Sequence, residues 1–254
     1  MKKIASRDNA IFKMLSKIER HSKERRESGK AILDGVHLVE SCIASGIEPD
    51  LVIVREDCTD KPEILGILKG RECVSMLDTL FDRLSPVKSP TGILALLSIP
   101  VPEPAHQPEF CAFLDEIQDP GNMGAILRSA AAAGASDIYL SRGCADPWSP
   151  KVLRSGMGAH FSLRIHEDQD LVDAMRHYHG EKIALDLDAD ISIYDIDLRG
   201  KTGFVIGNEG AGISKEVLGC SSARAKIPMP GKIESLNAAQ AAAICFFERV
   251  RQKA

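Results

Sequence analysis

Short apolar runs alternate with helical segments along the second half of this chain, and that alternation constrains the fold more than any other feature. Runs with the composition of buried strands occur at residues 111–114, 137–140, 161–165, 182–187, 204–206 and 224–227. Helical patterns occupy residues 123–133, 151–158, 171–178 and 235–251. Strands that alternate with helices form a mostly parallel sheet covered on both faces, so we predict an α/β fold. Ligands bind such sheets beyond the carboxyl ends of the strands, where the polar, glycine-rich segments of this chain fall.

A proline-rich segment divides the chain. Residues 100–108 read PVPEPAHQP, and four prolines in nine residues make an extended, stiff connection. Before it, helical patterns at 8–23, 36–44 and 62–68 alternate with apolar runs at 31–33, 51–54 and 93–97. We therefore predict a small α/β domain over residues 1–99, a linker over 100–109 and a larger α/β domain over 110–254. The length of 254 residues agrees with the expectation of about two domains.

Charge is distributed unevenly along the chain. The net charge is −4, which would disfavour a nucleic-acid partner. Residues 1–30, however, contain ten Lys or Arg and four Asp or Glu, a local charge of +6 that leaves −10 for the remainder. A basic arm on an acidic body indicates contact with a polyanion at one end. The alternative is a charged helix that only improves solubility.

Several classes of protein and site are disfavoured. No apolar stretch approaches the ~20 residues that a membrane span needs, and the basic N-terminus lacks the apolar run of a secretory signal. The seven cysteines are scattered without a CxxC pair, which is typical of reduced thiols in a cytosolic protein. The histidines form no HExxH, so we expect no metal site. The reduced thiols and the missing secretory signal together predict a cytoplasmic location.

Two polar segments follow predicted strands. The first, residues 115–128, leads from a strand through Asp-Pro-Gly-Asn into a helix that carries Asn122 and Arg128. A helix cap and a surface arginine would explain it structurally. The second, residues 207–212, reads GNEGAG, and its glycines permit close approach of a ligand to the backbone. Its spacing matches neither a dinucleotide fingerprint nor a P-loop, and Glu209 inside the turn is hard to explain as structure alone.

A third segment precedes the last helix. Residues 227–237 read IPMPGKIESLN, a rigid loop followed by Ser235 and Asn237, either of which could cap the helix. The alanines that follow indicate close backbone packing.

In order, spacing and position at strand ends, these three segments resemble the signature motifs of the SpoU (TrmH-type) branch of the SPOUT RNA methyltransferases. The resemblance covers about residues 110–252. Residues 1–100 resemble the substrate-binding domain often attached to this family, related in fold to ribosomal protein L30e, through Ser6-Arg-Asp-Asn and Asp34-Gly-Val-His-Leu-Val-Glu. The resemblance implies a deep trefoil knot in the last third of the chain, a rare topology that periodicity cannot indicate.

The resemblance also implies an activity: methyl transfer from S-adenosylmethionine to a ribose 2′-hydroxyl of RNA, with ribosomal RNA favoured over transfer RNA, by a homodimer. It implies catalytic or orienting roles for Arg128, Asn122, Glu209, Ser235 and Asn237. By position it puts the cofactor against Gly207, Ile227 and Leu236, with Leu185, Met229 and Ala238 nearby. The family commonly has Val-Ser after Ser-Leu-Asn, where this chain has Ala238 and Ala239, so a hydroxyl is missing.

The basic arm then has a predicted role in binding RNA phosphates while the first domain selects RNA by shape. The residues predicted to make these contacts are Lys13, Lys17, Arg20, Lys23, Arg25 and Arg26. Two other functions remain open: a transfer RNA methyltransferase, and a non-catalytic RNA-binding factor that keeps the fold. A nucleotide-dependent oxidoreductase is disfavoured because the glycine pattern it needs is absent.

Overall fold

A computed structural model describes residues 1–85, 87, 89–103 and 107–254. The described chain divides into two compact units. Unit 1 comprises Met1–Pro100 with Asp146–Phe161, and unit 2 comprises Val101–Ala145 with Ser162–Ala254. Residues 104–106 of the predicted linker lie outside the described residues.

Unit 1 contains a five-stranded mixed sheet in the order β1-β4-β3-β5-β2. Its strands are β1 (Lys2–Ile4), β2 (Lys30–Asp34), β3 (Leu51–Arg55), β4 (Cys73–Met76) and β5 (Ile93–Ser98). Its helices are α1 (Ala10–Arg20), α2 (Ser22–Ser28), α3 (Val36–Ala44), α4 (Pro62–Leu68), α5 (Asp78–Leu84) and α7 (Pro150–Gly156). Short 3₁₀ turns occupy Glu56–Cys58 and Ala159–Phe161. Strands β1, β4 and β3 run parallel, while β5 is antiparallel to both β3 and β2.

The first helical pattern forms two helices rather than the single one predicted over 8–23. Asn9 caps α1 by accepting a hydrogen bond from the Ile11 amide, and Phe12, Leu15 and Ile18 supply the buried face. The chain then turns at His21, whose extended backbone separates α1 from α2.

The segment Asp146–Phe161 lies between two strands of unit 2 in the sequence but packs within unit 1. The Arg25 guanidinium donates to Asp146 at 2.8 Å through Nε, and both side chains are nine-tenths buried. A Cβ on Gly158 would lie 2.9 Å from the Ser41 side chain, so α3 and this segment are in close contact. The predicted second domain, residues 110–254, includes this segment, because periodicity carries no information on which core a helix joins.

Unit 2 contains a seven-stranded sheet in the order β10-β12-β9-β11-β6-β7-β8, with every described pair parallel. Its strands are β6 (Phe110–Leu114), β7 (Asp137–Ser141), β8 (Arg164–Gln169), β9 (Glu181–Leu185), β10 (Ile191–Ser192), β11 (Thr202–Ile206) and β12 (Ala223–Lys226). Its helices are α6 (Pro120–Ala132), α8 (Leu171–His177), α9 (Lys215–Leu218) and α10 (Ala238–Lys253), with a 3₁₀ turn at Ile193–Asp195. The predicted α/β fold with a mostly parallel sheet is confirmed.

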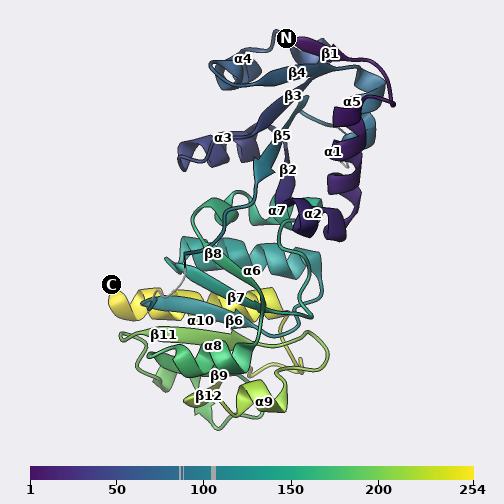
Figure 1. Ribbon diagram of the computed structural model, residues 1–254. Helices are drawn as coiled ribbons and strands as arrows, with labels where there is room; N and C mark the ends of the chain where they lie inside the picture. The colour runs from purple at the N-terminus through teal and green to yellow at the C-terminus, as the bar shows by residue number, and fades with distance from the viewer. Residues whose placement is uncertain (86, 88, 104–106) are drawn as a thin grey trace. The chain divides into compact units, whose positions relative to one another are not determined.

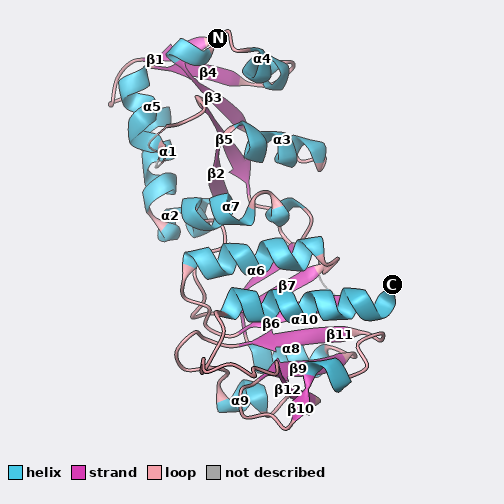
Figure 2. Cartoon of the chain, turned by 180° about the vertical axis from the view of Figure 1, so that it is seen from behind, coloured by secondary structure: helices cyan, strands magenta, loops and turns pink. Residues whose placement is uncertain are grey.

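Helices cover both faces of this sheet. Figures 1 and 2 show α6 and α10 side by side on one face and α8 on the other. On the first face, the rings of Phe110, Phe204 and Phe246 meet at centroid distances of 5.5–5.9 Å. On the second, Phe113 stacks on Tyr139 and meets Tyr178 edge-on. Alternate residues of β6 therefore enter two different cores, as a central parallel strand requires.

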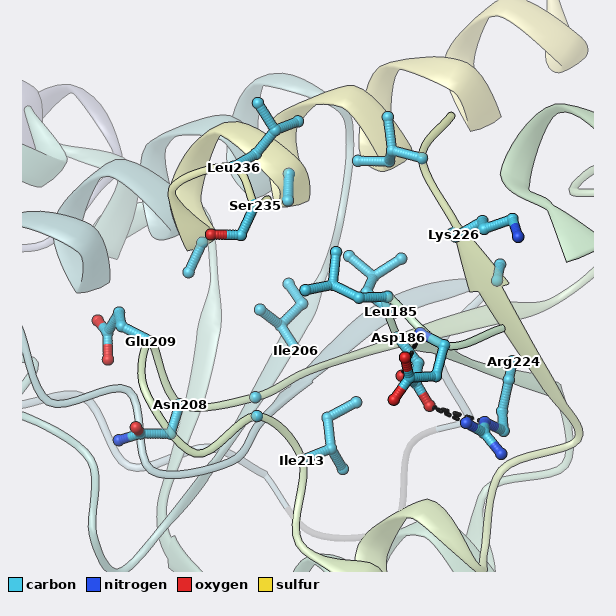
Figure 3. Close-up of a pocket in the computed structure, with 18 of the residues that line it drawn as sticks. Leu185, Asp186, Ile206, Asn208, Glu209, Ile213, Arg224, Lys226, Ser235 and Leu236 are labelled. Atoms are coloured by element: carbon cyan, nitrogen blue, oxygen red, sulfur yellow. Dashed lines mark hydrogen bonds and ion pairs between the residues drawn. The ribbon is translucent and has the colours of Figure 1, made fainter. Parts of the chain in front are cut away.

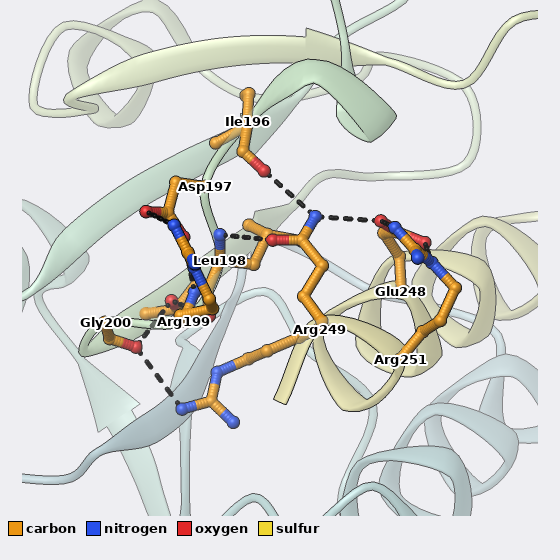
Figure 4. Close-up of polar contacts among 10 residues, drawn as sticks. Ile196, Asp197, Leu198, Arg199, Gly200, Glu248, Arg249 and Arg251 are labelled. Carbon is orange, nitrogen blue, oxygen red and sulfur yellow. Dashed lines mark hydrogen bonds and ion pairs between the residues drawn. The ribbon is translucent and has the colours of Figure 1, made fainter. Parts of the chain in front are cut away.

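Polar contacts fasten the last turns of α10 to the loop before β11 (Figure 4). Gln252 donates to the Ile196 carbonyl at 3.0 Å and accepts from the Leu198 amide at 2.8 Å. The Arg249 guanidinium donates to the Glu109 carbonyl and packs over the ring of Phe110. These contacts hold the C-terminal end of α10 against the segments that precede β11 and β6.

Some predicted boundaries differ from those observed. Strand β8 begins three residues later than predicted, and α10 begins at Ala238 rather than at 235. Strands β1 and β4 and helix α5 have no predicted counterpart, because each is only three to seven residues long and contains at most three apolar residues. No helix in the described part of the chain is long and apolar enough to cross a membrane.

Candidate functional site

A cavity of about 540 Å³ lies beyond the carboxyl ends of β9, β11 and β12 (Figure 3). All six residues predicted to contact the cofactor line it: Leu185, Gly207, Ile227, Met229, Leu236 and Ala238. Two of the predicted catalytic residues, Glu209 and Ser235, line it as well. Two of the three motifs, residues 207–212 and 227–237, thus line one concave site.

The middle of the cavity is apolar, and at Gly207 two backbone segments of its wall lie close together. Leu185, Ile206 and Ile213 point into it in Figure 3. At Gly207 a Cβ would lie 2.3 Å from the carbonyl carbon of Gly212, so any side chain would collide with backbone. A planar, largely apolar group such as a nucleobase suits these walls, and glycine lets it approach the main chain.

Side chains from all three motifs form one chain of hydrogen bonds beside the cavity. The Asn122 amide donates to Glu209 Oε1 at 2.8 Å. The Asn237 amide donates to Asn122 Oδ1 at 2.9 Å, while its own Oδ1 caps α10 by accepting from Ala239. The capping role expected of Ser235 or Asn237 therefore belongs to Asn237. The Ser235 side chain is exposed at the cavity wall.

Glu209 is held as a carboxylate. Partial burial alone would raise its pKa, but hydrogen bonds from Asn122 and from the amides of Gln118 and Asp119 outweigh it, so the pKa of Glu209 lies below its usual value. Glu209 consequently fixes the loop before α6 against the loop after β11. It cannot donate a proton near neutral pH.

Further contacts, not foreseen from the sequence, connect the same loops. Asn208 donates to the Glu116 carbonyl at 2.8 Å and accepts from the amides of Gly210 and Ala211. Buried Asp115 accepts from the Ser214 amide at 2.9 Å. Glu116 has a left-handed backbone, with φ 55°, an uncommon conformation that functional loops often hold. The polar composition of 115–122 and 207–214 was the only signal for these contacts.

Arg128 lies apart from this chain of contacts. It stands on α6 six residues after Asn122, roughly 9 Å along the helix axis, and its side chain is exposed. It forms no ion pair with any residue that the structure describes. Its guanidinium is available to an incoming anion.

An ion pair that the sequence analysis missed closes the cavity at the other end. Arg224 on β12 donates through Nε to Asp186 Oδ2 at 2.7 Å, and both residues line the cavity with Lys226. In the sequence these positions fall within runs predicted as strands, and nothing there marks them as part of a site. Among the described residues, no group of three or more His, Cys, Asp or Glu side chains could hold a metal ion.

Five of the six predicted phosphate-binding residues are exposed on α1 and α2, and one is not. Lys13, Lys17, Arg20 and Lys23 are exposed beside acidic neighbours at 2.9–3.9 Å, and Arg26 is exposed too. Arg25 is only 5% exposed, and its guanidinium is engaged by Asp146 and by the carbonyls of Ile18 and Glu19. The prediction that Arg25 contacts phosphate is therefore wrong. Charge counting along a sequence cannot distinguish a buried structural arginine from an exposed one.

Comparisons with known proteins agree with this geometry. A model of the SpoU rRNA Methylase family matches residues 109–247, and a model of the MRM3-like substrate binding domain matches residues 9–95. The chain is 31% identical to an uncharacterized tRNA/rRNA methyltransferase of Synechocystis over 98% of this chain and 94% of that relative. It is 30% identical to the Bacillus subtilis 23S rRNA (guanosine(2553)-2'-O)-methyltransferase RlmP over 97% of this chain and 98% of that protein.

Solved structures give the same result. The SpoU methyltransferase AviRb from Streptomyces viridochromogenes, in complex with the cofactor AdoMet, is similar with a TM-score of 0.87 and 27% identity, covering 96% of this chain and 98% of that chain. The family model spans more than half of this chain and contains all three motifs. Two of them line the cavity, and Asn122 of the first is hydrogen-bonded to both. The chain belongs to the SpoU rRNA methylase family.

Proposed function

We propose that this protein transfers a methyl group from S-adenosylmethionine to a ribose 2′-hydroxyl of ribosomal RNA. The observation that carries the proposal is the hydrogen-bonded chain of Asn237, Asn122 and Glu209 at the edge of the 540 Å³ cavity. The relatives add the substrate class, since RlmP is a 23S rRNA 2′-O-methyltransferase and AviRb is a SpoU methyltransferase that binds AdoMet.

The cavity fits the cofactor. S-adenosylmethionine combines a nucleobase, a ribose and an amino acid, and supplies an electrophilic methyl group when bound. The apolar middle of the cavity suits the base, and Gly207 permits backbone contact. Glu209 holds a full negative charge at the cavity edge, where a cationic ligand gains from it.

Arg128 acts on the acceptor RNA in this proposal. A guanidinium stays protonated in a protein, so Arg128 anchors a phosphate and stabilises the negative charge that develops on the ribose oxygen. The hydroxyl proton passes to solvent water as the methyl group is transferred, and the donor leaves as the neutral thioether. The side chain of Arg128 is exposed on α6, the helix whose Asn122 is hydrogen-bonded to Glu209, and this position supports the role. Positioning of the hydroxyl supplies much of the remaining rate enhancement.

The rest of the chain serves RNA selection and assembly. Residues 1–99 form an L30e-like domain that binds the RNA, as the match to a substrate-binding domain model supports. Residues 110–254 form the catalytic domain, with a deep trefoil knot in its last third. Two such chains form a homodimer through this domain, and the protein works in the cytoplasm. The exposed apolar side chains Phe247 and Val250 on α10 support a covered face there.

The proposal is tested by replacing Arg128. We expect Arg128→Ala to reduce methyl transfer to 23S rRNA transcripts at least 100-fold and to leave S-adenosylmethionine binding in calorimetry unchanged, because Arg128 does not line the cavity. Arg176→Ala, another exposed arginine, on α8, is the matched control and should retain full activity.

Full activity of Arg128→Ala would contradict the catalytic assignment. Binding of RNA by the natural chain without any methyl transfer would favour the non-catalytic RNA-binding factor instead. Transfer to tRNA but not to rRNA would favour the transfer RNA enzyme.

A further inference from the structure

The cavity has two polar ends of different character (Figure 3). At one end, Glu209, Asn208 and Ser235 lie beside the reaction motifs. At the other, Asp186, Arg224 and Lys226 bring together charges of both signs. The apolar side chains of Leu185, Ile206 and Ile213 occupy the space between.

The charged end retains hydrogen-bonding capacity. Asp186 Oδ2 accepts from two of the five N–H groups of Arg224, which leaves three donors on that guanidinium. Asp186 Oδ1 accepts only from the Asp188 amide, at 3.0 Å, so it can accept once more. Lys226 has no ion-pair partner among the residues that the structure describes. Free donors and a free acceptor thus face the same cavity wall.

We propose that this end of the cavity, formed by Asp186, Arg224 and Lys226, is a subsite for an α-amino carboxylate, the amino-acid end of the methyl donor. The inference rests on the proposed function and names which part of the ligand these residues take. Arg224 and Lys226 bind the carboxylate, and Asp186 accepts from the ammonium group.

Charge matching supports this assignment. The methyl donor has two charged parts, a sulfonium and an amino-acid zwitterion. The sulfonium belongs at the end where Glu209 joins the reaction motifs, because the methyl group leaves from there. The zwitterion then requires a wall that offers both signs of charge, and Asp186 with Arg224 and Lys226 is that wall. The uncharged adenine is left for the apolar middle.

Two ligands that lack the sulfonium charge test the subsite directly. S-adenosylhomocysteine and 5′-methylthioadenosine share the adenosyl thioether and differ in the amino-acid tail. We expect the natural protein to bind the first at least tenfold more tightly in calorimetry. Arg224→Gln and Asp186→Asn should each weaken binding of S-adenosylhomocysteine about fivefold, because each removes one partly exposed charge interaction with the ligand. Neither substitution should change the affinity for methylthioadenosine.

A matched control comes from the same unit. Arg199 also pairs with an aspartate, Asp197, through Nε at 2.8 Å (Figure 4). Neither residue lines the cavity, so Arg199→Gln should change neither affinity. Lys226→Gln provides a second test that leaves the Arg224–Asp186 pair intact.

The outcomes separate the two proposals. The subsite is overturned if Arg224→Gln lowers the affinity for both ligands equally, or if none of the three substitutions lowers the affinity for S-adenosylhomocysteine. The methyltransferase assignment stands in either case. Failure of the natural protein to bind either ligand overturns both. Thermal melting of each variant shows whether it is folded, and Lys226→Gln decides the question should Arg224→Gln not fold.

Discussion

Polar side chains at the candidate site are held in place because their amide groups both donate and accept hydrogen bonds. Asn122 donates to Glu209 and accepts from Asn237, and Asn208 donates to the loop after β6 and accepts from amides of its own loop. Residue types could be predicted from the sequence because the motifs contain them. Their partners could not, since residues about 90–115 positions apart meet only in the folded chain.

His160 offers a prediction on pH dependence at this scale. Complete burial lowers the pKa of His160 to about 4. Its Nε2 lies 2.8 Å from the Pro147 carbonyl, while Nδ1 has no partner among the described residues, so protonation would bury an N–H without an acceptor. The unfolded chain takes up this proton near pH ~6.5. The contribution of neutral His160 to the free energy of unfolding is therefore full above that pH and falls, by at most roughly 1.4 kcal/mol per pH unit, as the pH drops toward 4.

Trp148, the one tryptophan of the chain, reports on this change because its ring centroid lies 5.2 Å from that of His160. We expect urea unfolding followed by Trp148 emission to show the fall in stability between pH 7 and 5. His160→Gln should reduce the slope. A natural protein and variant with the same pH dependence would contradict the assignment.

Helices and strands were predicted well where apolar spacing is regular and poorly where it is short. The bounds of α3 and α4 agree with their apolar patterns. Strand β1 has three residues and one buried side chain, which is too little pattern for any prediction. Helix α10 begins later than predicted because Asn237, not Ser235, supplies the cap. At the element scale, one residue therefore both starts a helix and completes the candidate site.

Asn237 allows those two roles to be separated. Asn237→Asp keeps the oxygen that caps α10 and adds a negative charge at a helix N-terminus, which favours the helix. It removes the N–H that donates to Asn122. We expect the melting temperature to remain unchanged within experimental error while methyl transfer falls at least tenfold. Asn237→Ala loses both functions and should also cost about 1 kcal/mol of stability. If Asn237→Asp keeps full activity, the contact with Asn122 has no functional role.

At the scale of the whole molecule, chain order and spatial grouping differ. The sequence indicates two consecutive domains, whereas Asp146–Phe161 leaves the second stretch and packs in unit 1, through contacts such as that of Arg25 with Asp146. Hydrophobic periodicity describes each element but not its neighbours, so an exchange of this kind has no sequence signal. The uneven charge, by contrast, is visible in the sequence and has a structural counterpart on α1 and α2.

The basic arm is best tested by substitution, because a deletion of residues 1–30 would also remove the core side chains Phe12, Leu15 and Ile18. The variant replaces with Gln the five exposed cations Lys13, Lys17, Arg20, Lys23 and Arg26. Each surface ion pair on the arm contributes little to stability, so the variant should fold. We expect weaker RNA binding and a salt dependence whose slope is reduced by about 3.5, since each of five phosphate contacts contributes about 0.7 for a single strand.

The control replaces Arg199, Lys201 and Lys253, which are exposed in unit 2, and should leave the RNA affinity and its salt slope unchanged. Filter binding at several salt concentrations measures both quantities for the two variants. An arm variant with the natural slope would mean that α1 and α2 serve solubility only. A slope reduced as much by the control would mean that the RNA responds to overall charge rather than to the arm, because a long-range field does not depend on which cations are removed.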